Sequence, residues 1–129
     1  MKLVADTNIF LAVALNEPEK QRIIELTLGS EIIAPEILPY EVGNALSAML
    51  KRRQLSAEEI ILAFEKTQQI PVSLVKSNIK NSLEIAINYS IYAYDAYFLQ
   101  TALAHHCPLL TLDKKMKLVA NALNMTVLE

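Results

Sequence analysis

A chain of 129 residues that is 53% hydrophobic is long enough to bury a core, and we expect a single domain over residues 1–129. The single cysteine, Cys107, excludes an intramolecular disulfide framework and a zinc site built on thiolates. Because a lone cysteine fits a reducing compartment, we expect a cytoplasmic protein. The net charge of −2 argues against a protein that grips long duplex DNA through many phosphate contacts.

No segment is expected to enter a membrane or a secretion pathway. No apolar run reaches the roughly 20 residues that span a bilayer. Near the N-terminus, Asp6, Thr7 and Asn8 interrupt the unbroken apolar segment that a signal peptide requires.

The first half of the chain alternates between strand and helix patterns. A buried strand is predicted over residues 2–5, and Asp6, Thr7 and Asn8 supply helix-capping residues before an apolar run over residues 9–15. A second helix is predicted from Glu17 to the Gly29-Ser30 stop signal, and a second strand over residues 32–34. The residues of the second helix expected to face the core are Ile23, Ile24, Leu26 and Leu28.

The alternation continues to the end of the chain. Pro35 and Pro39 bound a turn before an amphipathic helix that reaches Arg53. Ser56 and Glu59 have the spacing of a capping box at the start of a helix that ends before Pro71. The remaining predicted elements are a strand at 72–75, helices at 79–89 and 94–106, a strand at 109–112, a helix at 113–123 and a short last strand at 125–128.

This order of elements predicts an α/β fold with a mostly parallel sheet of four to five strands covered by helices on both faces. In such sheets ligands bind outside the carboxyl ends of the strands. Asp6 and Asp113 each follow a predicted strand directly, so the topology alone is expected to place them at the same edge.

Four acidic residues stand at strand ends or at the edges of core-facing helices: Asp6, Glu41, Asp95 and Asp113. Taken singly, Asp6 and Asp113 have a simpler explanation as helix N-caps, and the helix dipole favours Asp95 in a first turn. Glu41 has no such explanation, because it lies at the border of an apolar stripe without a nearby cation. Carboxylates without histidine or cysteine ligands select Mg²⁺ or Mn²⁺ over zinc, so together the four predict a site for a hard divalent cation.

Two basic clusters remain to be explained. Lys51, Arg52 and Arg53 are read as an ordinary solvated surface. The second cluster follows Asp113 at a helix start, where the helix dipole disfavours cations. A nearby anion such as a nucleic-acid phosphate would account for these residues, which are Lys114, Lys115 and Lys117.

The acidic residues lie in four sequence blocks that resemble, in order and spacing, those of PIN-domain ribonucleases, and in particular the VapC toxins of toxin–antitoxin pairs. The blocks are Val4-Ala5-Asp6-Thr7-Asn8, Glu41-Val42-Gly43-Asn44-Ala45-Leu46, Tyr94-Asp95-Ala96-Tyr97-Phe98-Leu99-Gln100-Thr101-Ala102 and Leu110-Thr111-Leu112-Asp113. The resemblance covers the whole chain. The tyrosine-aspartate-alanine helix start and the threonine two residues before the last aspartate make it specific.

The resemblance implies that the four acids hold one or two Mg²⁺ or Mn²⁺ ions and that the reaction is hydrolysis of RNA, leaving 5′-phosphate and 3′-hydroxyl ends. It also implies an antitoxin partner and a homodimer. Lys117 stands where many members of the family carry a further acid, and this difference argues against a second metal ion. The residues expected to orient the carboxylates are Thr7, Asn8, Asn44 and Thr111, and local capping explains Thr7 equally well.

Two other functions compete with that of a nuclease. A degenerate PIN domain that binds RNA or protein without cutting is the alternative, although the chain keeps all four acids. A phosphoacceptor receiver domain is rejected, because it needs an acidic pair after the first strand, where this chain has Asp6 alone.

Several other polar and aromatic residues are not assigned to the site. His105 and His106 are read as structural or surface residues at a helix end, and Cys107 as a small hydrophobic side chain. For the tyrosines at 89, 92, 94 and 97, packing in the core or at a dimer interface is preferred over stacking on bases.

Overall fold

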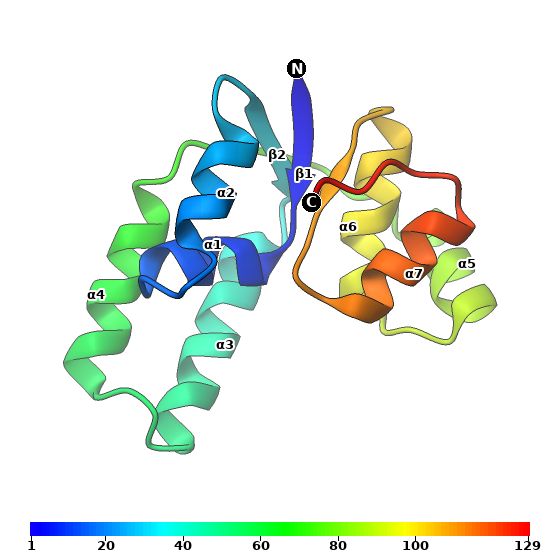
Figure 1. Ribbon diagram of the computed structural model, residues 1–129. Coiled ribbons are helices and arrows are strands. Elements are labelled where there is room, and N and C mark those ends of the chain that lie inside the picture. The colour runs from blue at the N-terminus through cyan, green and yellow to red at the C-terminus, as the bar shows by residue number, and fades with distance from the viewer.

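The computed structural model describes all residues from 1 to 129 and contains one sheet of four parallel strands in the order β3-β2-β1-β4 (Figure 1). In the register of the sheet, Val4 aligns with Ile33 on one side and with Leu109 on the other. The predicted α/β class with a parallel sheet is therefore confirmed, with four strands. They are β1 (Lys2–Ala5), β2 (Glu31–Pro35), β3 (Ser73–Val75) and β4 (Leu109–Leu110).

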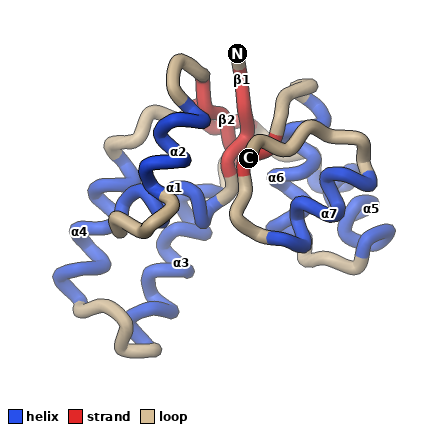
Figure 2. The backbone as a smooth tube through the Cα atoms, viewed as in Figure 1, coloured by secondary structure: helices blue, strands red, loops and turns tan.

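Seven helices surround the sheet, and Figures 1 and 2 show α1 to α4 on one side of β1 and α5 to α7 on the other. Covering both faces explains why β1 has no polar alternation: Leu3, Val4 and Ala5 are all fully buried. None of the helices is both long enough and apolar enough to cross a membrane. The helices are α1 (Thr7–Ala14), α2 (Lys20–Thr27), α3 (Leu38–Lys51), α4 (Ala57–Gln68), α5 (Ile79–Tyr89), α6 (Ala93–Ala104) and α7 (Lys114–Ala122).

The core lies between the sheet and the helices that pack directly on it. Phe10 of α1 and Phe98 and Leu99 of α6 are among the most deeply buried side chains, and α6 contacts both β1 and β2. This packing holds the carboxyl end of β1 against the first turn of α6. The polar residues that follow β1 and open α6 are thereby brought together.

Local sequence signals set several element boundaries as expected. Ser56 and Glu59 form the predicted capping box at the start of α4. Gly29 has φ +75°, a left-handed conformation that suits the turn after α2. Helix α5 has the predicted bounds, whereas α6 ends at Ala104, before the two histidines.

Two details of the prediction were wrong in α2 and near the C-terminus. Ile23 is buried, but Ile24 and Leu28 are 41% and 82% exposed, because α2 offers only one narrow face to its neighbour α1. Residues 125–128 form a single bridge between Leu109 and Val127 in place of a fifth strand.

Strand β4 is also shorter than predicted, with two residues in place of the four at 109–112. After β4 the chain leaves the sheet at Thr111, whose side chain makes hydrogen bonds with Asp6 and with the backbone N–H of Asp113. These bonds turn the chain from the sheet into the start of α7.

Candidate functional site

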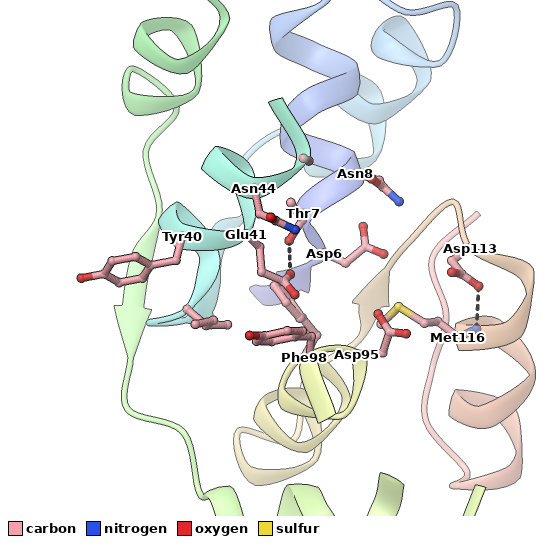
Figure 3. A pocket seen from close by; sticks show the side chains of 13 residues that line it. Asp6, Thr7, Asn8, Tyr40, Glu41, Asn44, Asp95, Phe98, Asp113 and Met116 are labelled. Atoms are coloured by element: carbon pink, nitrogen blue, oxygen red, sulfur yellow. Dashed lines mark hydrogen bonds between the residues drawn. The ribbon is translucent and has the colours of Figure 1, made fainter. Parts of the chain in front are cut away.

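A cleft of about 350 Å³ opens at the carboxyl ends of β1 and β4, and all four predicted acids line it. Asp6 follows β1 directly, Glu41 and Asp95 lie in the first turns of α3 and α6, and Asp113 precedes α7. Figure 3 shows the carboxylates of Asp6 and Asp95 between Glu41 on one side and Asp113 on the other. The three aspartates of the chain thus all reach this one cleft.

Asp6 is the most deeply buried of the acids, at 4% exposed. It occupies the N-cap position of α1, yet its side chain makes no capping hydrogen bond, so capping does not explain it. One carboxylate oxygen, Oδ2, accepts a hydrogen bond from Thr111 Oγ1, and the other, Oδ1, is buried without any partner. An unpaired buried carboxylate oxygen is costly, and a ligand in the cleft would remove that cost.

Thr111 connects Asp6 to Asp113. Its hydroxyl donates to Asp6 and accepts a hydrogen bond of 3.0 Å from the backbone N–H of Asp113. Asp113 in turn caps α7, because its Oδ1 accepts a bond of 3.1 Å from the backbone N–H of Met116. Thr111 is almost fully buried and lies behind the cleft wall, where it fixes the orientation of Asp6.

Glu41 is held by a residue of another helix. Its Oε2 accepts a hydrogen bond of 2.6 Å from Thr7 Oγ1, which is drawn as a dashed line in Figure 3. None of the four acids has an ion-pair partner. The two ion pairs of the structure lie elsewhere, between Arg22 and Glu25 and between Lys117 and Glu129.

Burial and mutual repulsion raise the pKa values of three of these acids. Burial raises the pKa of Asp6 to about 6, the hydrogen bond from Thr111 opposes the rise, and the charges of Asp113 and Asp95 add to it. The pKa of Glu41 is raised by burial, lowered by the bond from Thr7 and raised further by Asp95.

The pKa of Asp95 is also raised. Burial is the largest cause, the charge of Asp113 adds to the rise, and the cation of Lys115 opposes it. A group of carboxylates that resists ionisation in this way is stabilised by any cation that enters the cleft.

The chemistry of the cleft fits a hard divalent cation. Its charged donors are all carboxylate oxygens, which Mg²⁺ and Mn²⁺ prefer, and Asp6 Oδ1 is a buried donor without a partner. The side chains as they stand form no closed ligand set, since no three acidic, histidine or cysteine residues are grouped closely enough to hold an ion. Binding would therefore need the partly exposed acids Glu41, Asp95 and Asp113 to turn toward Asp6.

The other residues expected at the site are placed unevenly. Asn8 and Asn44 line the cleft with exposed side chains and make no hydrogen bond to the acids. The three lysines of the second basic cluster do not line it. Lys115 donates to the carbonyl of Ser90 over 3.2 Å, near enough to Asp95 to affect its pKa, and Lys117 pairs with Glu129.

Sequence reasoning did not assign several residues that the cleft contains. Phe98 and Met116 lie three positions after Asp95 and Asp113, and residues at this spacing share a helix face, so the spacing could have identified them. Tyr40 precedes Glu41 and is 75% exposed. Nothing in the sequence distinguishes it from an ordinary surface aromatic residue.

Comparison with known proteins places the chain in a family. The family model of the PIN domain matches residues 3–122. A comparison with curated protein sequences gave no match.

Solved structures share the fold at low sequence identity. A chain of VapBC2 from Rickettsia felis, solved bound to a DNA fragment from its promoter, has a TM-score of 0.68 at 17% identity, covering 100% of this chain and 98% of that one. PAE2754 from Pyrobaculum aerophilum has a TM-score of 0.65 at 17% identity, with 92% and 87% covered. FitAcB from Neisseria gonorrhoeae has a TM-score of 0.61 at 17% identity, with 98% and 96% covered. With the family model spanning nearly the whole chain, this protein belongs to the PIN domain family.

Proposed function

We propose that this protein is a Mg²⁺- or Mn²⁺-dependent endoribonuclease that hydrolyses RNA phosphodiester bonds. One observation carries the proposal: carboxylates from four separate parts of the chain line one cleft, none has a cationic partner, and a buried oxygen of Asp6 has no partner at all. A scaffold has no use for such an arrangement, because each unpaired carboxylate lowers the stability of the fold.

In this proposal Asp6, Glu41, Asp95 and Asp113 hold the metal. When bound, a divalent ion lowers the pKa of a water molecule and stabilises the leaving oxygen of an in-line displacement. The chain's own contribution is orientation and exclusion of water.

Two threonines supply the orientation. Thr111 fixes one oxygen of Asp6 and leaves the other free, and Thr7 holds Glu41 across the gap between α1 and α3. The burial of Asp6 excludes water and strengthens every charge interaction around it.

Residues around the cleft are suited to RNA. Asn8 and Asn44 offer exposed amide groups at its wall, where they can donate to phosphate or ribose oxygens. Lys114 and Lys115 are exposed at the start of α7 and can attract the phosphate backbone, whereas Lys117 is occupied by Glu129. We expect Lys117 to contribute least of the three to RNA binding.

We further propose that the protein is the toxin of a cytoplasmic toxin–antitoxin pair and forms a homodimer. The sequence resemblance to VapC toxins supports this role, and the fold likeness to a chain of VapBC2 agrees with it. An antitoxin that offers a basic residue to the acidic cleft would neutralise the charge that the metal otherwise neutralises. Co-expression of the neighbouring open reading frame, followed by purification of a complex, tests the pairing.

An RNA cleavage assay tests the reaction. Purified protein is incubated with total RNA and Mn²⁺ or Mg²⁺, with and without EDTA, and the new ends are identified. We expect cleavage that EDTA abolishes, 5′-phosphate ends, and loss of activity in Asp6→Asn and Glu41→Gln. The matched control is Glu84→Gln on the exposed face of α5. If the metal-loaded wild type only binds RNA, or if Asp6→Asn cuts normally, the protein is a non-catalytic PIN scaffold and the proposal is wrong.

A further inference from the structure

A second pocket, of about 530 Å³, adjoins the acidic cleft. The strand order explains its position, because the acidic cleft lies at the carboxyl ends of β1 and β4 and the second pocket at those of β2 and β3, along the same edge of the sheet. Ile37 and Tyr40 line both spaces, so the two are neighbours that share a wall. The residues that line only the second pocket are Glu36, Pro39, Leu74, Ser77, Ile79 and Tyr97.

Aromatic rings mark the boundary between the two spaces. Tyr94 of the cleft and Tyr97 of the second pocket are in edge-to-face contact, with ring centroids 6.1 Å apart at 71°. Figure 3 shows the ring of Tyr40 pointing away from the carboxylates. A flat ligand that extends out of the acidic cleft would therefore meet tyrosine rings and the apolar side chains of Leu74 and Ile79.

One residue of this pocket wall carries a buried polar atom that has no partner. The hydroxyl of Ser77, in the loop between β3 and α5, is shielded from solvent and makes no hydrogen bond. Buried hydroxyl groups are almost always paired, so an unpaired one in a pocket wall suggests a ligand that pairs with it. Glu36 is the only charged residue of the wall and can accept a hydrogen bond from an amino or imino group.

We propose that this pocket binds a nucleobase of the RNA whose backbone occupies the acidic cleft. The inference rests on the proposed function, because it takes RNA as the substrate. A nucleobase has a flat face for the tyrosine rings and a polar edge for Ser77 and Glu36. The pocket is then a specificity subsite, which selects the nucleotide beside the bond that is cut.

Nuclear magnetic resonance titrations test this subsite without any turnover. Isotope-labelled protein in EDTA is titrated with AMP, GMP, CMP or UMP, and separately with ribose 5-phosphate. At least one nucleotide should shift the amide signals of Leu74, Ser77 and Ile79 saturably, and ribose 5-phosphate should not. Because no metal is present, this result does not depend on cleavage.

Two variants and a matched control sharpen the test. Ser77→Ala should weaken nucleotide binding about fivefold, the effect of one lost hydrogen bond. Leu74→Trp should abolish binding, since the half-exposed position allows a larger side chain to fill the pocket. Ser73→Ala, an exposed serine outside the pocket, should bind as the wild type does.

Three results would overturn the subsite. They are shifts confined to the acidic cleft, equal shifts with ribose 5-phosphate, or shifts that follow protein concentration, which would make the pocket an interface between two copies of the chain. Nucleotide binding here together with no RNA cleavage would instead remove the proposed function and leave a nucleotide pocket. RNA cleavage with no shift at Leu74, Ser77 and Ile79 would remove the subsite and leave the proposed function intact.

Discussion

The N-cap residues of α4 and α1 differ in what their side chains do. At α4, Ser56 accepts from the backbone N–H of Glu59 over 3.2 Å, and Glu59 accepts from the backbone N–H of Ser56 over 3.0 Å. At α1, Asp6 stands in the N-cap position and leaves the helix uncapped. One of its oxygens is bound to Thr111 and the other has no partner. The first arrangement maximises the stability of a helix, and the second gives up that stability to present a carboxylate to a cleft.

The pKa values of Glu59 and Asp6 move in opposite directions, and each shift has its own cause. Glu59 is exposed, and hydrogen bonds from Ser56 hold the pKa of its carboxyl below the usual value. Asp6 is buried among other acids, and its pKa rises to about 6. Both residues lie at a helix N-terminus, so the helix dipole does not decide the outcome. Hydrogen bonds decide the pKa of Glu59, whereas burial and the neighbouring charges decide that of Asp6.

The largest expected effect comes from Asp6→Asn. We expect RNA cleavage to fall by more than about a hundredfold, beyond the effect of residues that only orient metal ligands. Without metal at pH 7.5 the variant should be more stable than the wild type by about 2 kcal/mol, because it no longer holds a buried carboxylate that resists ionisation. Urea unfolding and the cleavage assay measure the two effects. A variant that is less stable and still active would show that Asp6 is structural.

Thr111→Val should reduce cleavage by about 10- to 100-fold, since the oxygen of Asp6 loses the hydrogen bond that orients it. Because this bond lowers the pKa of Asp6, the acid limb of the pH–rate profile should also move to higher pH. Thr111→Ser keeps the hydroxyl and should restore both properties. An unchanged pH profile in Thr111→Val would mean that the threonine only packs against Met116.

Acid should weaken metal binding and stabilise the protein without metal. With the pKa of Asp6 at about 6, calorimetry should give Mn²⁺ affinity about tenfold lower at pH 5 than at pH 7.5, because protons compete with the metal.

The stability of the metal-free protein has the opposite dependence on pH. The folded-state pKa of Asp6 lies above its ordinary value of 3.8, so the folded state binds the proton more tightly than the unfolded state. Stability without metal should then rise as the pH falls from about 7 to 4. Asp6→Asn should have a weaker dependence of stability on pH, and what remains comes from the raised pKa values of Glu41 and Asp95. A wild type whose metal affinity is constant over this range would exclude Asp6 as a ligand.

Ser56→Ala should have the smallest effect, a loss of stability that leaves the acidic cleft unchanged. Loss of the capping box at α4 should lower the free energy of unfolding by about 1 kcal/mol, measured in urea. Cleavage at 25 °C should stay at the wild-type level, because α4 contributes nothing to the cleft. A fall in activity that exceeds the loss of folded protein would connect α4 to the site and remove the contrast between the two helix starts.

The sequence predicted those parts of the fold whose cause is local. Buried apolar runs marked β1 and β2, and apolar spacing marked α5 to the residue. The errors occurred where contacts between residues far apart in the sequence decide burial or strand pairing. Leu28 is apolar but exposed, and it lies just beyond the last residue of α2. The strand expected at residues 125–128 forms a single bridge, between Val127 and Leu109 of the two-residue strand β4.

The residues of the cleft likewise divide into those whose position could be predicted and those whose position could not. That Asp6 and Asp113 meet follows from parallel strands, whose carboxyl ends share one edge of the sheet. That Lys117 turns to Glu129 could not be foreseen, because this contact depends on how the last residues return to α7. Tyr40 was missed because an exposed tyrosine carries no signal of its own until the neighbouring pocket is visible.

Crystals soaked in Mn²⁺ and measured at a wavelength where manganese scatters anomalously would show whether the acidic cleft holds a metal ion. We expect an anomalous peak in the cleft, bonded to Oδ1 of Asp6, the oxygen that has no partner in the protein. We also expect the peak to be lost in Asp6→Asn. A cleft without a peak at saturating Mn²⁺, with water alone on that oxygen, would contradict the proposed metal site.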